Sequence, residues 1–180
     1  MDTPNRNRSI LRRYTSIPSL LHILYNRRIT LLSPAKWEDK NDVFSMNEFK
    51  ERKGLEFVLA VCFSEAKETF HHWKVFTHES EGVCIEFKRK ELLLAFDNVA
   101  NILTGSVKPI LISDLEKSPP KVDNLPFIKR LPYMDEKEFR IVYLGRVAPV
   151  SGALPNLAEG APGPALLGTG GWKTHIPLGG

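Results

Sequence analysis

Apolar and polar residues alternate along this chain with two different periods, which predict short helices and short strands. After Ser16, a typical helix N-cap, apolar residues recur every three or four positions up to Arg28. Pro18 fits this helix because proline is tolerated in a first turn. Residues 57–64 instead form a nearly continuous apolar run, the pattern of a strand buried on both faces. The chain therefore mixes both kinds of element.

The same criteria predict further elements along the rest of the chain. Helices are expected at residues 17–28, 43–53, 69–76 and 91–96. Strands are expected at residues 10–14, 29–33, 57–64, 82–87 and 139–144, and another within residues 101–113. Because these strands and helices alternate only loosely, we predict an α+β fold with a mixed, mainly antiparallel sheet and short flanking helices.

The composition changes sharply near Gly145. Residues 146–180 hold eight of the twelve glycines and five of the thirteen prolines. So much backbone freedom with so little apolar bulk does not favour a helix or a strand. We therefore predict one α+β domain over residues 1–147 and a flexible Gly/Pro-rich insertion or tail over residues 148–180. Residues 172–178 are expected to return to the domain as a short strand.

Composition also limits where the protein acts. The 180 residues are 42% hydrophobic and 26% charged, as in globular domains. The longest uncharged apolar run, residues 57–63, is too short to cross a bilayer, and residues 1–8 are polar and basic, unlike a secretory signal. The two cysteines, Cys62 and Cys84, form no disulfide framework. We expect a soluble cytoplasmic protein without a membrane partner.

The net charge of +4 is concentrated in the first part of the chain, since residues 1–28 carry six arginines against Asp2 alone. Such a stretch can attract phosphates, so nucleic acid is one candidate partner. Among the arginines that precede residue 15, however, Tyr14 is the only aromatic residue, whereas a single-strand binding surface interleaves several. A solvated N-terminus is the simpler interpretation.

The first candidate for catalytic chemistry is the pair Glu136 and Glu138 at the start of the last predicted strand. Residues two apart on an extended backbone point to the same side. Two carboxylates held close together raise one another's pKa, which suits acid–base catalysis or stabilisation of a developing cation. The alternative is a solvated turn in which Lys137 and Arg140 pair with these acids.

The second candidate is the motif Glu86-Phe-Lys88. A carboxylate and a lysine on one strand face, with Asp39 or Asp42 as a further acid, resemble the core of a metal-dependent nuclease. This spacing is common by chance, and an exposed strand edge is the simpler interpretation.

A third candidate is His71-His72-Trp73. Adjacent histidines on a helix point in different directions, whereas a zinc site on a helix needs two histidines four positions apart. We expect one of these histidines to cap the helix, to lie at the surface or to line a pocket beside Trp73. No metal is expected.

Four blocks of the chain keep the order and spacing of a known pattern. They are residues 13–34, 37–42, 62–87 and 129–140, with Trp37-Glu-Asp-Lys-Asn-Asp42, Cys62-Phe-Ser-Glu65 and Asp135-Glu-Lys-Glu-Phe-Arg140 among them. Over residues 10–145 they resemble a bacterial family known as domain of unknown function 2971. That family usually reads Asn-Asp-Pro where this chain has either Asn41-Asp42-Val43 or Glu38-Asp39-Lys40, and it continues beyond the Ile-Pro-Leu of residues 176–178. The resemblance therefore implies a truncated end of the domain.

More remotely, the layout resembles that of ADP-ribosyltransferases, in which a first-strand arginine and a middle-strand hydroxyl grip NAD and a late-strand glutamate supports glycosidic cleavage. The resemblance implies that Arg13 anchors the pyrophosphate, Ser64 orients the ribose and Glu138 stabilises the oxocarbenium-like transition state. Glu136 is then the first acid of an E-x-E pair. The residues that could stack on the nicotinamide ring are Tyr14, Trp37 and Trp73.

These resemblances imply an NAD- or nucleotide-handling transferase without a metal. They imply catalytic roles for Glu136 and Glu138, and cofactor-binding roles for Arg13, Tyr14, Ser64 and Trp73. They also predict that Arg13, Ser64 and Glu138 converge on one cleft. The alternatives are a non-catalytic module that binds nucleic acid or protein, and a metal-dependent nuclease.

Overall fold

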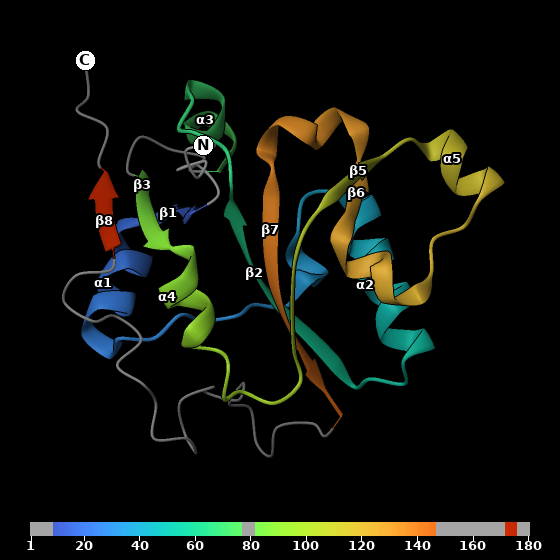
Figure 1. The fold of residues 1–180 in the computed structure, drawn as a ribbon, viewed down its shortest axis with the longest axis horizontal. Coiled ribbons are helices and arrows are strands. Elements are labelled where there is room, and N and C mark those ends of the chain that lie inside the picture. The colour runs from blue at the N-terminus through green and yellow to red at the C-terminus, as the bar shows by residue number, and fades with distance from the viewer. Residues whose placement is uncertain (1–8, 77–81, 147–171, 176–180) are drawn as a thin grey trace, which may run out of the picture. The chain divides into compact units, whose positions relative to one another are not determined.

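The computed structural model describes residues 9–76, 82–146 and 172–175 of the chain. They belong to two compact units, most of whose helices and strands are labelled in Figure 1. Unit 1 contains Met1–Thr30, Phe63–Ala100 and Asn156–Gly180, and unit 2 contains Leu31–Cys62 and Asn101–Pro155. The flexible segment predicted at residues 148–171 lies outside the described residues, as do residues 176–178 of the predicted last strand.

Unit 1 consists of antiparallel strands and short helices. The strands are β1 (Ile10–Ser16), β3 (Gly82–Lys88) and β8 (Trp172–His175), and the helices are α1 (Ile17–Asn26), α3 (Phe70–Phe76) and α4 (Arg89–Leu94). Strand β3 pairs with β1 on one side, from Ile10↔Lys88 to Ser16↔Gly82, and with β8 on the other. Strand β3 is therefore internal, and the expectation of an exposed edge at this segment is wrong.

Helix α1 forms where the pattern predicts it. Ser16 is its N-cap, and the side chain of Ser16 accepts a hydrogen bond from the backbone N–H of Ser19 at 3.4 Å. Leu20 and Ile23 form its buried face. The helix ends two residues earlier than predicted because Arg27 adopts the left-handed conformation, with φ of 51°.

Unit 2 contains an antiparallel sheet and a separate pair of parallel strands. The antiparallel sheet has the order β4 (Ile102–Ser106), β7 (Glu138–Gly145) and β2 (Phe57–Ser64, whose last two residues belong to unit 1). The N–H of Glu56, just before β2, donates to the carbonyl of Gly145 at the end of β7 at 3.0 Å. The parallel pair is β5 (Lys108–Ile110) with β6 (Ile128–Arg130).

The helices of unit 2 pack against this framework. They are α2 (Lys40–Arg52), α5 (Ile112–Lys117) and the 3₁₀ helices η2 (Pro34–Lys36), η3 (Val122–Phe127) and η4 (Leu131–Glu136). Asp39 caps α2, because its Oδ1 accepts a hydrogen bond from the N–H of Asn41 at 3.0 Å. Met46 and Phe49 of α2 join the core that Val58 of β2 and Val142 of β7 complete. Burying a side chain of the size of Phe49 contributes about 1.5–3 kcal/mol.

The predicted α+β class with a mainly antiparallel sheet is confirmed, but one local prediction is wrong. Residues 29–33 form no strand; within them only Leu32 makes an isolated bridge, to Ala60. Residues 101–113 hold the expected strand, β4, which pairs with β7, and also a second one, β5, which pairs with β6. Within the parts of the chain that the structure describes, no helix has the length and apolar character needed to cross a membrane.

Candidate functional site

All four charged side chains that are buried in the described structure belong to unit 2. They are Asp42, Glu136, Glu138 and Arg140, which are 5%, 4%, 7% and 0% exposed. With Lys129, whose side chain is 13% exposed, they form a group that we call the ionic cluster. Helix α2, strands β6 and β7 and η4 bring these residues together, although 98 positions separate Asp42 from Arg140.

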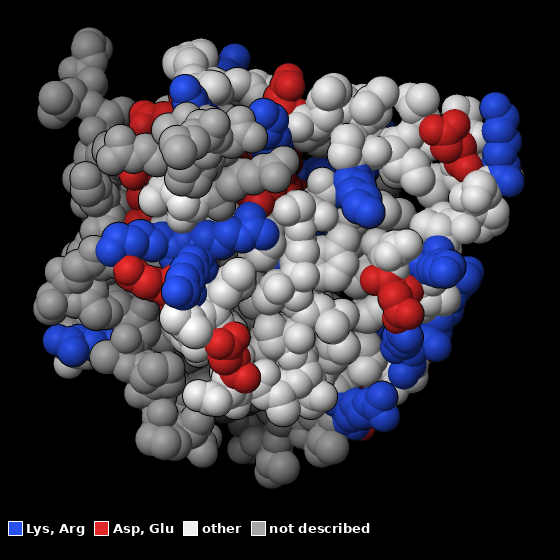
Figure 2. All heavy atoms as spheres, viewed as in Figure 1, with Lys and Arg blue, Asp and Glu red and all other residues white. Residues whose placement is uncertain are grey.

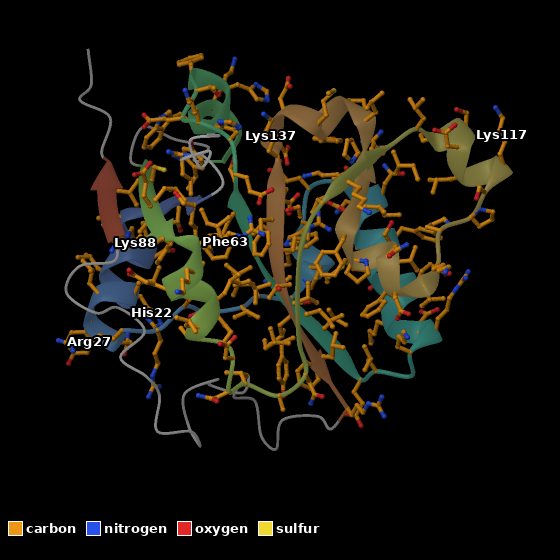
Figure 3. All side chains as sticks on the ribbon, in the orientation of Figure 1. His22, Arg27, Phe63, Lys88, Lys117 and Lys137 are labelled. Atoms are coloured by element: carbon orange, nitrogen blue, oxygen red, sulfur yellow. The ribbon has the colours of Figure 1, made fainter. Side chains whose placement is uncertain are left out.

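Glu136 and Glu138 meet at the ammonium group of Lys129. Glu136 ends η4, Glu138 begins β7, and Lys137 between them has a left-handed φ of 41° (Figure 3). Lys129 Nζ donates to Glu136 Oε2 at 2.6 Å and to Glu138 Oε2 at 3.1 Å. The two carboxylates therefore point to one place, as expected, but a turn and not an extended backbone brings them there.

Arg140 is the centre of the ionic cluster. Its Nε donates to Glu138 Oε1 at 2.7 Å and its Nη2 donates to Glu138 Oε2 at 3.0 Å, the two-pronged geometry that guanidinium and carboxylate groups favour. The same Nη2 donates to Asp42 Oδ2 at 2.7 Å, while Nη1 donates to the carbonyl of Pro126 at 3.0 Å. The guanidinium also lies over the ring of Trp37, 4.8 Å from its centroid. Trp37, a predicted stacking residue, is thus already stacked on a cation.

The environment keeps Glu138 ionised. Burial by itself would raise the pKa of Glu138, but Arg140 and then Lys129 outweigh this effect and lower that pKa to about 2. The thiol of Cys62 adds a further hydrogen bond to the same carboxylate.

Glu136 and Asp42 behave in the opposite way. Burial raises the pKa of Glu136, and Lys129 offsets this only in part. Burial likewise raises the pKa of Asp42 by more than Arg140 lowers it. The cluster therefore contains one carboxyl group with a lowered pKa and two with raised pKa values. Environments that move the pKa values of neighbouring acids apart are typical of acid–base sites.

A layer of partly exposed residues lies beside the ionic cluster. Arg130 Nη2 donates to the hydroxyl of Tyr133 at 3.1 Å and to Asp39 Oδ1 at 3.4 Å. The ring of Tyr133 lies under both cations of β6, 4.8 Å from Lys129 Nζ and 5.3 Å from the guanidinium of Arg130. The side chain of Arg130 is 34% exposed, so it is the cation of this layer most accessible to an anionic ligand.

The loss of stability at low pH tests whether Glu138 is ionised in the folded protein. A carboxyl group whose folded-state pKa lies near 2 stabilises the protein above its unfolded-state pKa near 4.5, and this stabilisation is lost as the pH falls from 4.5 towards 2. We expect the Glu138→Gln variant to lose less free energy of unfolding over this interval than the wild type. Urea unfolding at a series of pH values measures the difference, and parallel pH profiles would contradict the assignment.

In unit 1, two of the predicted cofactor-binding residues contact each other. The ring of Trp73 meets the ring of Tyr14 edge-on at 5.3 Å, and the ring of His72 stacks on Tyr14 at 5.6 Å. His72 is 2% exposed and its Nδ1 lies 2.9 Å from the hydroxyl of Thr69. The histidine is therefore a buried member of an aromatic group, and the expected surface position does not apply to His72.

The other two predicted cofactor-binding residues occupy different positions in unit 1. Arg13 lies opposite Ile85 and Tyr14 lies opposite Cys84, so strand alternation directs them to opposite faces of β1. Arg12, not Arg13, shares the face of Tyr14, and it forms an ion pair with Glu86 at 2.7 Å. Ser64 is 3% exposed, and its hydroxyl accepts a hydrogen bond from the N–H of Ala66 at 3.0 Å. Arg13, Tyr14, Ser64 and Trp73 belong to unit 1, whereas Glu136 and Glu138 belong to unit 2.

The two cysteines lie in different chemical environments. Cys84 is 0% exposed, and burial raises the pKa of its thiol to about 12 although the hydrogen bond with Tyr14 lowers it, while Cys62 is partly exposed. Because the thiolate is the reactive form, we expect iodoacetamide to label Cys62 in the folded protein and to leave Cys84 unmodified. A Cys62→Ser variant should then react only after unfolding, as peptide mass spectrometry measures. Rapid labelling of Cys84 in this folded variant would contradict the expectation.

The residues of the nuclease alternative have partners elsewhere. Glu86 pairs with Arg12, and Lys88 donates to Glu91 at 2.8 Å. Asp39 and Asp42 belong to the other unit. Among the described residues, no three histidine, cysteine or acidic side chains are grouped so that they could hold a metal ion.

The basic N-terminal stretch is only partly described. Residues 1–8, with two of its arginines, lie outside the described residues. Arg12 donates to the carbonyl of Ala66 at 2.7 Å besides its pair with Glu86. On the face drawn in Figure 2, basic and acidic side chains of the described residues are intermixed. Nucleic-acid binding therefore stays a prediction.

Several members of the site were not singled out for it from the sequence. Arg140 appeared as a possible partner of the acids, Lys129 only within the block of residues 129–140, and Asp42 only as a candidate metal ligand and as part of a family-like block. One signal was present, because Arg140 is a single charged residue inside the apolar stretch of β7, where a buried charge needs a partner. No signal in the sequence named Asp42 as that partner.

Comparison with protein-family models, curated proteins and solved structures finds no match to this chain. The geometry of unit 2 is therefore the basis on which a function can be argued.

Proposed function

We propose that this chain is an NAD- or nucleotide-handling enzyme of the transferase type that cleaves a glycosidic bond at the ionic cluster. One observation carries the proposal: Glu136 and Glu138 share the ammonium of Lys129, yet the pKa of Glu136 is raised and that of Glu138 is lowered. Two carboxylates with such different proton affinities can perform two different tasks in one reaction.

Cleavage of NAD would use the two acids as follows. The bond between the ribose carbon and the nicotinamide nitrogen breaks, and nicotinamide leaves as a neutral molecule with the bonding electron pair. The sugar carbon becomes positively charged. With three ionised carboxylates and two cations, the ionic cluster has one net negative charge, which stabilises the positive charge on the sugar. Glu136 then accepts the proton of the attacking hydroxyl group, a task for which a raised pKa is suited.

The roles that the resemblances imply for Arg13, Ser64, Tyr14 and Trp73, which belong to unit 1, stay predictions. Membership of the family known as domain of unknown function 2971 and a cytoplasmic location belong to the same proposal, the latter because both cysteines are free thiols.

Incubation of the purified protein with NAD tests the function directly. We expect release of nicotinamide, measured by liquid chromatography, and its loss in the Glu136→Gln variant. A matched control is Glu48→Gln, which changes a half-buried residue of α2 that pairs with the exposed Arg52 and lies outside the ionic cluster. If the wild type neither releases nicotinamide nor binds NAD in calorimetry, the proposal is wrong.

A further inference from the structure

Two aspartates at the start of α2 each have one buried carboxylate oxygen that accepts no hydrogen bond from the described residues. Asp39 and Asp42 are three residues apart, which places them on one face of the helix. Each gives one carboxylate oxygen to an arginine: Asp39 Oδ1 to Arg130 and Asp42 Oδ2 to Arg140. The other oxygens, Asp39 Oδ2 and Asp42 Oδ1, are buried and have no hydrogen-bond donor among the described residues.

A buried carboxylate oxygen without a hydrogen-bond donor lowers the stability of the protein, so its presence needs an explanation. The two side chains are only 8% and 4% exposed, and a buried acceptor without a donor costs about 1–3 kcal/mol. Most buried polar atoms in proteins have a partner. Glu138, in the same cluster, has hydrogen bonds to both of its oxygens. Among the described residues, each aspartate therefore has one buried carboxylate oxygen that accepts no hydrogen bond.

The charges around these oxygens limit the class of ligand that can supply the donors. Lys129, Arg130 and Arg140 already pair with the two aspartates, so a cationic ligand would have to compete with three cations for their oxygens. A phosphate group would meet the carboxylates themselves. Neutral hydroxyl groups avoid both penalties, and two acceptors on one helix face suit two adjacent hydroxyls.

We propose that Asp39 and Asp42 bind the paired 2′ and 3′ hydroxyl groups of a ribose ring. This inference rests on the proposed function and specifies its substrate: the sugar to be cleaved is a ribose with a free diol. Asp42 lies 3.7 Å from Lys129 Nζ, the atom that also holds Glu136. The 2′ hydroxyl is attached to the carbon next to the reacting one, so a contact with Asp42 strengthens as positive charge develops on the sugar.

Binding of the diol requires one side chain to move. Arg130 contacts Asp39 at 3.4 Å, a long hydrogen bond, and its side chain is more exposed than those of the other two cations, Lys129 and Arg140. Displacement of Arg130 from Asp39 frees that carboxylate for the sugar hydroxyl, and the guanidinium then faces solvent.

Calorimetric titration with two probes tests this assignment. Adenosine 5′-monophosphate carries the diol, and its 2′,3′-dideoxy analogue does not. We expect the wild type to bind the first about ten- to a hundredfold more tightly, since hydrogen bonds to charged groups contribute about 1.5–3 kcal/mol. In the Asp39→Asn variant this preference should fall at least several-fold. Asparagine is as good an N-cap as aspartate, so α2 is retained.

Two further variants complete the test. Asp123→Asn, which alters an exposed residue of η3 paired with Lys53, should keep the preference. Asp42→Asn should reduce the preference in a protein whose thermal unfolding shows it to be folded. Equal affinity for both probes, absence of binding by either probe, or an unchanged preference in Asp39→Asn would each overturn the inference.

The outcomes separate this inference from the proposed function. Nicotinamide release that depends on Glu136, with no diol preference, would leave the function standing and remove the roles of Asp39 and Asp42. A diol preference that Asp39→Asn abolishes, without nicotinamide release, would keep the ribose site and remove the proposed reaction.

Discussion

Replacement of Arg140 by methionine is expected to lower the free energy of unfolding by about 3–5 kcal/mol. The guanidinium is 0% exposed and donates to Glu138, to Asp42 and to the carbonyl of Pro126. Methionine has a similar length but carries no charge, so two carboxylates would remain buried without their main partner. Urea unfolding followed by tryptophan fluorescence measures the loss.

A matched control separates burial from charge. Arg52 also pairs with a glutamate, Glu48 at 2.8 Å, but its side chain is 59% exposed. An exposed pair four residues apart on a helix contributes about 0.3–0.5 kcal/mol, so Arg52→Met should have a small effect. If Arg140→Met cost no more than Arg52→Met, the cluster would be solvated in solution and its role as a buried site would be refuted.

The second large effect concerns catalysis. We expect Glu136→Gln to reduce the rate of nicotinamide release by about a hundred- to ten-thousandfold, the usual contribution of a general base. Glutamine has nearly the same shape but cannot accept the proton of the attacking hydroxyl. The loss should therefore appear in kcat and leave KM nearly unchanged, as steady-state kinetics with NAD measures.

The pH dependence of the rate provides a second, independent test of the role of Glu136. Burial raises the pKa of Glu136 above its ordinary 4.5. Below this raised pKa the group is protonated and cannot act as a base. The wild-type rate should therefore fall as the pH decreases through this value, and the residual rate of Glu136→Gln should not show this limb. An unchanged acid limb in the variant would assign it to another group.

Elements that follow from a local sequence pattern could be predicted, whereas an element that depends on a distant pairing partner could not. The apolar run of residues 57–64 and the alternation of residues 82–87 predicted β2 and β3, because these patterns depend only on neighbouring residues. The short strand β6 could not be found this way: its three residues, Ile128–Arg130, adopt the extended form by pairing with β5, which lies about twenty positions earlier. Pairing over that distance leaves no periodic trace in so short a segment.

The sequence by itself determined the α+β class, the positions of most longer elements and the proximity of Glu136 to Glu138. Only the tertiary structure decided the chemistry of these acids. A pKa depends on which charges lie within a few ångströms and on how much water is excluded. For Glu138 the deciding charges are Arg140 and Lys129, and for Arg140 a second partner, Asp42, comes from a helix 98 positions away. Folding brings these groups together, and so it decides that Glu138 stays charged while Glu136 can carry a proton.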